Sequence, residues 1–219
     1  METHTTSHGL SLKKRVTLLT SFLILLLPMV VVADVCTYEK AVSFTVPVDA
    51  VQRLSIRAET GALAVHALPA QDGRQDGGQQ DEIRVEARVC SARKAALDDM
   101  DVVHTLNGDV LLVQAVIPEI DSAFWINHYP YIDMDFGIPA GLAVTIKDGS
   151  GDIQVSGTGA LRIDDGSGEL RIAQVGGTVS ISDGSGSIDV MDVEQAVTIL
   201  EDGSGSTEYR NITGDIFLP

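Results

Sequence analysis

The tetrapeptide "DGSG" occurs four times in the last third of this 219-residue chain, at 148–151, 165–168, 183–186 and 202–205. The first residues of successive copies are 17, 18 and 19 positions apart. Glycine adopts backbone conformations that other residues avoid, and Asp and Ser favour turns, so each copy indicates a corner of the chain. One corner motif at nearly even spacing is typical of proteins built from stacked repeats.

Apolar residues recur at fixed distances from these DGSG corners. Apolar residues two positions apart lie on one face of a β-strand, and each coil between corners carries two such pairs. A single coil cannot bury its pairs alone, but coils stacked ~4.8 Å apart align them into one core. The pairs are Ile153/Val155, Leu161/Ile163, Leu170/Ile172, Val179/Ile181, Ile188/Val190 and Val197/Ile199, with a further apolar slot at Val175, Val193 and Ile212. We therefore predict an all-β, single-domain β-solenoid, in which each coil is as long as the interval between two corners and contains two short strands.

The N-terminal half of the chain contains the same layout. The segment "LSIRAETGALAV" at 54–65 matches "LAVTIKDGSGDIQV" at 142–155, because in both a Gly follows the first apolar pair by five residues and precedes a second pair. We predict regular coils over 142–219 and a degenerate coil over 44–90.

The residues between these parts are less regular. A polar, glycine-rich loop is predicted at 70–82 and one short helix at 91–100, with strands around 110–116 and 132–138. The N-terminal part of the solenoid is therefore expected to be irregular.

The segment at 1–33 has the composition of an export signal. The basic segment Lys13–Arg15 precedes an apolar run at 16–32, and "VVA" at 31–33 supplies small residues for cleavage after Ala33. We predict a signal peptide at 1–33 and an exported domain at 34–219 in the periplasm, outside the cell or on its surface. The alternative is an uncleaved anchor, since the apolar run at 16–32 is just long enough to span a membrane as a helix.

The chain has two cysteines, Cys36 and Cys90. In an exported protein an even number of distant cysteines indicates a disulfide. We predict a bond between them, with two free thiols as the alternative.

The leader, the two cysteines, "FGIPAGLAVTI" at 136–146 and the tandem "DGSGDIQV"-type coils together resemble the bacterial putative-adhesin family of secreted, toastrack-like β-solenoids. The resemblance extends over roughly 36–219. It implies a β-helical envelope protein without an established enzymatic activity, and it supplies no catalytic residues.

The charge of the chain restricts its partners. A formal net charge of −16 argues against nucleic acid and anionic membrane surfaces, which bind basic patches. An acidic protein suits cationic ligands or divalent metals. A membrane is expected to be a partner only through an uncleaved leader.

The Asp of each corner, namely Asp148, Asp165, Asp183 and Asp202, is expected to stack into a ladder of carboxylates. Two explanations for such a ladder remain open. Each Asp can accept backbone N–H bonds within its own turn, or the ladder can bind Ca²⁺ weakly, since calcium prefers carboxylate and carbonyl oxygens. No other cofactor is expected.

Other polar residues do not form a recognisable site in the sequence. The histidines of the exported chain, His66, His104 and His128, lack the spacing of metal ligands. Asp133 and Asp135 alternate with apolar residues, so we expect them on the solvated face of a strand. No nucleophile elbow and no phosphate-binding loop motif occurs.

Four of the few aromatic residues occur in "AFWINHYPY" at 123–131: Phe124, Trp125, Tyr129 and Tyr131. This stretch is either a cap over the first coils or a partner-binding patch, because exposed Trp and Tyr anchor partners and stack on sugars.

Two classes of function follow from the sequence. The first is a non-enzymatic envelope protein, adhesin-like or a scaffold, that presents a rigid acidic surface to an unknown protein or cell-surface polymer. The alternative is a secreted β-helical enzyme acting on polysaccharides, or a calcium-binding repeat protein. Because basic residues are few among the coils and none repeats beside a carboxylate pair, we favour the non-enzymatic class.

The signal-peptide hypothesis predicts a mature N-terminus at Asp34. N-terminal sequencing of the protein recovered from cells tests this directly. Recovery of Met1 at the N-terminus of protein in the membrane fraction would show an uncleaved anchor instead.

Overall fold

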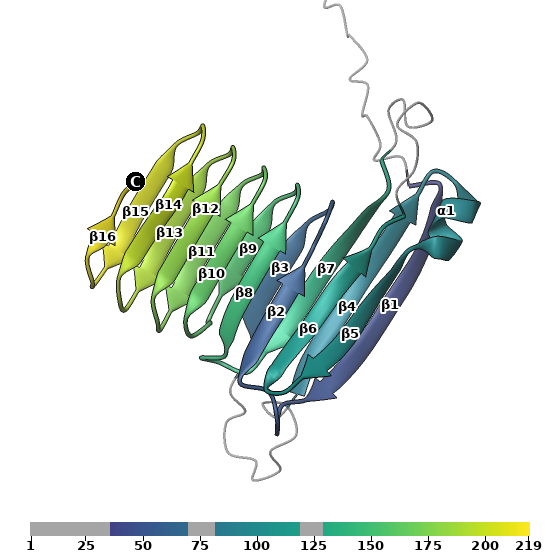
Figure 1. Cartoon of the computed structure of the whole chain (residues 1–219), viewed down its shortest axis with the longest axis horizontal. Coiled ribbons are helices and arrows are strands. Elements are labelled where there is room, and N and C mark those ends of the chain that lie inside the picture. Colours follow the sequence, from purple (N-terminus) through teal and green to yellow (C-terminus); the bar gives the residue numbers. More distant parts are fainter. Residues whose placement is uncertain (1–35, 70–81, 119–128) are drawn as a thin grey trace, which may run out of the picture. The chain divides into compact units, whose positions relative to one another are not determined.

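The computed structural model describes residues 36–69, 82–118 and 129–219. Within these ranges the chain is all-β with one short helix, and its strands form two eight-stranded sheets (Figure 1). The predicted leader and nearly all of the loop predicted at 70–82 lie outside the described residues. In the described part of the chain, no helix has the length and apolarity needed to cross a membrane.

The two sheets, called sheet A and sheet B here, contain both parallel and antiparallel pairs. Sheet A has the spatial order β1 (Tyr38–Pro47), β4 (Glu82–Ser91), β7 (Tyr131–Ile138), β3 (Leu63–Ala67), β9 (Ile153–Ser156), β11 (Leu170–Val175), β13 (Ile188–Val193) and β15 (Thr207–Ile212). Sheet B has the order β16 (Ile216–Phe217), β14 (Val197–Asp202), β12 (Val179–Asp183), β10 (Leu161–Asp165), β8 (Ala143–Asp148), β2 (Arg53–Arg57), β6 (Val110–Val116) and β5 (Asp101–Asn107). Helix α1 (Lys94–Asp99) packs against β4 and β1.

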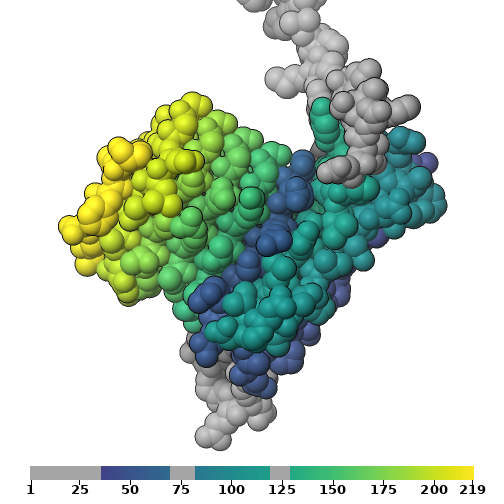
Figure 2. Space-filling view, viewed as in Figure 1, coloured from purple at the N-terminus to yellow at the C-terminus, as the bar shows by residue number. Residues whose placement is uncertain are grey.

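From β8 onward the chain alternates between the sheets, and each strand pairs in parallel with the equivalent strand of the preceding coil. Leu161 lies opposite Val144 on one side and Val179 on the other, so the apolar pairs expected from the spacing are in register. All of these pairs are buried. The coils lie side by side in chain order, and the space-filling view shows their side chains in close contact (Figure 2).

The predicted match between the N-terminal segment and the first regular coil is confirmed. Leu54 of β2 lies opposite Val144, and Leu63 of β3 lies opposite Ile153. The ends of the range expected for the degenerate coil, 44–90, have a different arrangement. There β1 pairs antiparallel with β4, and β4 pairs antiparallel with β7. Strands β1 and β4, of ten residues each, extend sheet A beyond the coil. The strands of the coil itself, β2 and β3, have five residues each.

The two glycines of each corner are needed because successive corners touch through their backbones. Gly168 has a φ of 149°, and a Cβ atom there would lie 1.9 Å from the carbonyl oxygen of Gly151 in the coil before. A Cβ on Gly166 would lie 2.3 Å from the carbonyl oxygen of Gly149. The amide of Gly168 donates to the carbonyl of Ser185 in the coil after, at 3.0 Å. Any side chain at either position would separate the coils.

The longest interval between corners is accommodated by a β-bulge. Ile181 lies opposite Ile199, but the next pair is Ser182 with Glu201, so Leu200 is left without a partner on β12. Leu200 is 43% exposed. The additional residue therefore leaves the inward slots on both sides of it in register.

The predicted disulfide is present. Cys36 and Cys90 are bonded, with their Cα atoms 5.4 Å apart and 54 residues of sequence separation. It joins the segment that leads into β1 to β4. In the chain-entropy model a loop of this length contributes on the order of 4 kcal/mol to stability.

The corner contacts predict that Gly168→Ala is strongly destabilising. The substitution adds both a backbone clash and an unfavourable φ, so the free energy of unfolding should fall by about 3–5 kcal/mol in urea denaturation. Gly108→Ala is the matched control, because Gly108 also has a positive φ, of 63°, but nothing within 4 Å of its Cβ position. It should cost about 1 kcal/mol. Equal losses in the two variants would show that coil contact is not the constraint.

Candidate functional site

Three acidic side chains of the DGSG corners stack in the interior. Asp148, Asp165 and Asp183 are the last residues of β8, β10 and β12, and they are direct cross-strand partners. Their relative exposures are 5%, 4% and 2%. Asp202 is next in register but is exposed, and it accepts a hydrogen bond of 2.9 Å from the hydroxyl of Thr207. We call the three buried residues the aspartate ladder.

Within the described part of the chain, both carboxyl oxygens of each ladder residue lack a hydrogen-bond partner. Burial raises the pKa of Asp148 to about 7, and the charge of Asp165 adds to this effect. Burial likewise raises the pKa of Asp165 to about 6, assisted by Asp183. Burial is also the main cause that raises the pKa of Asp183. The physical reason is that a carboxylate loses its hydration in the interior, which disfavours the charged form.

The surroundings of the ladder bear on the two explanations that the sequence left open, the turn device and weak calcium binding. The amides of Gly149, Ser167 and Ser185 lie close enough to the carboxyl groups to favour the charged forms, but none makes a hydrogen bond of ordinary geometry with them. Calcium binding at the ladder stays a prediction. No group of three His, Cys, Asp or Glu side chains in the described ranges is arranged to hold a metal ion.

The inward orientation of the ladder has a signal in the sequence. Leu161, Ile163 and Asp165 are spaced two apart, so strand alternation places all three on the same face. The same holds for Val179, Ile181 and Asp183. Each of these Asp residues is therefore both the first residue of a corner and the last residue of a buried strand.

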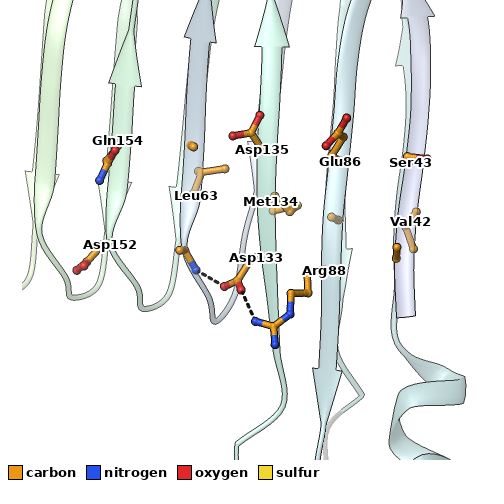
Figure 3. Close-up of a pocket in the computed structure, with 14 residues that line it drawn as sticks. Val42, Ser43, Leu63, Glu86, Arg88, Asp133, Met134, Asp135, Asp152 and Gln154 are labelled. Atoms are coloured by element: carbon orange, nitrogen blue, oxygen red, sulfur yellow. Dashed lines mark hydrogen bonds and ion pairs between the residues drawn. The ribbon is translucent and has the colours of Figure 1, made fainter. Parts of the chain in front are cut away.

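A second candidate site is a groove of about 720 Å³ on the outer face of sheet A. Its lining comes from five neighbouring strands: β1, β4, β7, β3 and β9. Ala62, just before β3, and Ala64, on β3, line it with short side chains. Figure 3 shows the polar side chains of this groove.

The charged residues that line the groove are mostly acidic. Glu86 of β4 lies directly opposite Asp135 of β7, and Asp152 also lines the groove. Among the described residues that line it, Arg88 alone is basic, and it is engaged by Glu39 at 2.9 Å and by Asp133 at 3.6 Å. Like charges directly opposite each other on a sheet are destabilising, so Glu86 and Asp135 repel each other in the groove.

Asp133 holds its place through contacts on both sides. One carboxylate oxygen accepts a hydrogen bond of 2.9 Å from the backbone amide of Ala62, and the other pairs with Arg88 (Figure 3). Asp135 pairs with His66 at 3.5 Å and remains largely exposed. The prediction that Asp133 and Asp135 lie on the solvated face of a strand is confirmed, since Met134 and Phe136 point into the core.

A second hollow of about 440 Å³ adjoins the groove. It shares Ala64, Asp135 and Gln154 with the groove and continues across β11 and β13. Neither hollow is predictable from the sequence, because both depend on which strands are neighbours in sheet A.

The aromatic stretch is only partly described. Phe124 and Trp125 lie outside the described residues. Tyr129 is 69% exposed. Tyr131 is half-buried in β7, where Arg88 donates to its hydroxyl at 3.3 Å and lies 5.9 Å from its ring centre.

Comparison with known proteins adds little beyond this geometry. The chain matches no family model and none of the curated proteins. Among solved structures it is similar to a putative cell adhesion protein from Clostridium sporogenes, at 9% identity and a TM-score of 0.35, over 83% of this chain and 99% of that chain. It is also similar to a putative adhesin from Bacteroides fragilis, at 10% identity and a TM-score of 0.28, over 82% and 97% of the two chains. A putative lipid binding protein from Parabacteroides distasonis matches at 11% identity and a TM-score of 0.28, over 81% and 94%.

At TM-scores of 0.35 and below, the likeness carries no argument about what this chain binds.

The inward position of the ladder predicts that calcium does not stabilise the protein. Calcium takes six to eight oxygen ligands, and the three ladder residues are almost completely buried, which leaves little room for water to complete such a shell. The melting temperature of the wild type should be the same in millimolar calcium and in chelator. The double variant Asp165→Asn/Asp183→Asn should be equally insensitive. A calcium-dependent rise in the wild type that is absent from the variant would establish a calcium site, since a ligand at 100 times its Kd contributes about 2.7 kcal/mol.

Proposed function

We propose that this chain is an exported, non-enzymatic, adhesin-like β-solenoid that binds a linear, cationic partner along the outer face of sheet A. The observation that carries the proposal is the groove over β1, β4, β7, β3 and β9, whose charged lining residues are mostly acidic. The parallel registers from β8 to β16 support the solenoid part of the proposal.

The extent of the groove favours an elongated partner. Together with the adjoining hollow it crosses seven neighbouring strands, from β1 to β13. Six intervals between strands correspond to about 30 Å. A partner lying across the strands would contact residues from both halves of the chain.

The charge of the groove favours a partner that carries amino groups. Glu86 and Asp135 are opposed on neighbouring strands, and no basic residue of the described chain lies between them. A cationic group placed there would relieve their repulsion as it bound. A protein segment rich in Lys and an amino-sugar polymer of the cell surface both provide such groups.

The rigidity of the face also supports a binding role. The disulfide Cys36–Cys90 secures β4 next to the groove, and Asp133 joins β7 to the segment before β3 through its hydrogen bond with Ala62. A preorganised surface loses little conformational entropy when it binds. The disulfide, together with the predicted leader, supports a location outside the cytoplasm.

Binding to soluble polymers tests the proposal. We expect the purified chain to bind oligolysine or deacetylated amino-sugar oligomers more tightly than the acetylated oligomers or polygalacturonate, as measured by fluorescence anisotropy. Ala64→Arg places a long cation where the groove meets the adjoining hollow and should weaken binding at least tenfold, or about 1.4 kcal/mol.

Ser180→Arg is the matched control. It adds the same charge on the outer face of sheet B, where Ser180 is half-buried on β12, so binding should be nearly unchanged. Melting temperatures of the two variants should both stay close to that of the wild type. Equal weakening by both substitutions would mean that only net charge matters, and the absence of binding to every cationic polymer would contradict the proposal.

A further inference from the structure

The aspartate ladder presents an electrostatic problem that does not involve the groove. Three carboxyl groups, each more than nine-tenths buried, are stacked on adjacent strands, and their oxygens have no hydrogen-bond partner among the described residues. Buried carboxylates without partners cost several kcal/mol each, so three charged groups in a row would strongly oppose folding.

A proton resolves this problem in a way that the stacking allows. A carboxylate is only a hydrogen-bond acceptor, whereas a protonated carboxyl is also a donor. Neighbouring ladder residues lie within side-chain hydrogen-bonding range, both Asp148 with Asp165 and Asp165 with Asp183. A bound proton therefore removes a charge and supplies a donor to the next oxygen. Each proton shared in this way gives a hydrogen-bond partner to two of the oxygens that otherwise have none.

We infer that Asp148, Asp165 and Asp183 form a buried proton-binding site, in which protonated carboxyls donate to their neighbours along the stack and make the coils more stable in acid than at alkaline pH. The species that this site binds is the proton, which the three carboxylates take up from solvent when the chain folds. The inference is independent of the proposed binding function.

The charged groups around the ladder strengthen this effect. At one end Glu59 raises the pKa of Asp148, and at the other end Asp202 raises that of Asp183. Tyr209, on β15, also interacts with Asp202. Arg57 and Lys147 line a cavity of about 410 Å³ with Asp148, but neither forms an ion pair with it in the described structure.

The direction of the pH dependence follows from the raised pKa values. Because the folded state binds these protons more tightly than the unfolded chain, the stabilisation is complete below the ordinary Asp pKa of about 3.9. It is lost as the pH rises through about 6 and about 7, the pKa values of Asp165 and Asp148. Carboxylates that form salt bridges on folding have the opposite dependence, since they stabilise proteins at neutral pH.

Thermal melting of the full-length chain between pH 4 and pH 8.5 tests the inference. The double variant Asp165→Asn/Asp183→Asn removes the charges but retains groups that can hydrogen-bond along the stack. Its melting temperature should exceed that of the wild type by about 5 °C or more at pH 8. The difference should disappear near pH 4, where the wild-type ladder is protonated.

Asp164→Asn is the matched control, because Asp164 is the outward-facing neighbour of Asp165 on the same strand. Its melting temperature should follow that of the wild type at every pH. Infrared difference spectra supply a direct readout: at pH 6 the wild type and the control should show the carbonyl band of a protonated carboxyl. The band should be smaller in the double variant, where only Asp148, whose pKa is raised mainly by burial, remains to supply it.

Two results would overturn the inference. One is a difference between the double variant and the wild type that does not change between pH 4 and pH 8. The other is a wild type that is more stable than the double variant at pH 8 only when calcium is present, because that would identify a cation in place of the proton.

Discussion

The close backbone contact between successive DGSG corners is the constraint on which the coil stack depends. With no side chain at either glycine, the carbonyl oxygen of one corner lies where the Cβ of the next would be. This contact sets the separation of the coils at the spacing of parallel strands, and it repeats at every corner. All residues at equivalent positions then become neighbours, whether they are apolar or acidic. The same constraint therefore aligns the apolar core and brings the three ladder carboxyls together.

Much of the fold was predictable from offsets measured within the sequence. The pair Ile188/Val190 and its counterparts are in register because stacking converts a sequence offset into a spatial neighbour. The match of Leu54 and Leu63 to the first regular coil was predicted for the same reason. The β-bulge at Leu200 follows from the longest of the intervals between corners.

The candidate site was predictable only in part. The stacking of the corner carboxylates was expected, but their burial depends on reading Asp165 as the last inward residue of a strand. The groove was not predictable, because it depends on the pairing of β7 with β3, and Asp133 and Ala62 are 71 residues apart in the chain. A periodic pattern identifies neighbours one coil apart. It gives no information about strands such as β4 that enter the sheet from outside the repeat.

The strands that carry the ladder also show why the coils pair in only one register. A shift of one residue would exchange the two faces of every strand, so Asp165 would face solvent while Arg162 and Asp164 would point into the core. Removing the exposed charges of Arg162 and Asp164 from water would be costly. Apolar residues in place of the three ladder aspartates would make the fold more stable at alkaline pH. The ladder carboxyls can instead be neutralised by protons, so they need no ion pair in the core.

The two ends of sheet A differ in how they would respond to mechanical load. The outermost strand β15 pairs only with β13 in the described structure, so tension on the C-terminal end would separate it one hydrogen bond at a time. Each coil released would expose the next, because each coil pairs only with its neighbours. At the other end β1 is paired over ten residues with β4 and joined to it by a covalent bond. Under tension the chain would lengthen in steps of a single coil from its C-terminal side, while the end stapled by Cys36–Cys90 remained folded.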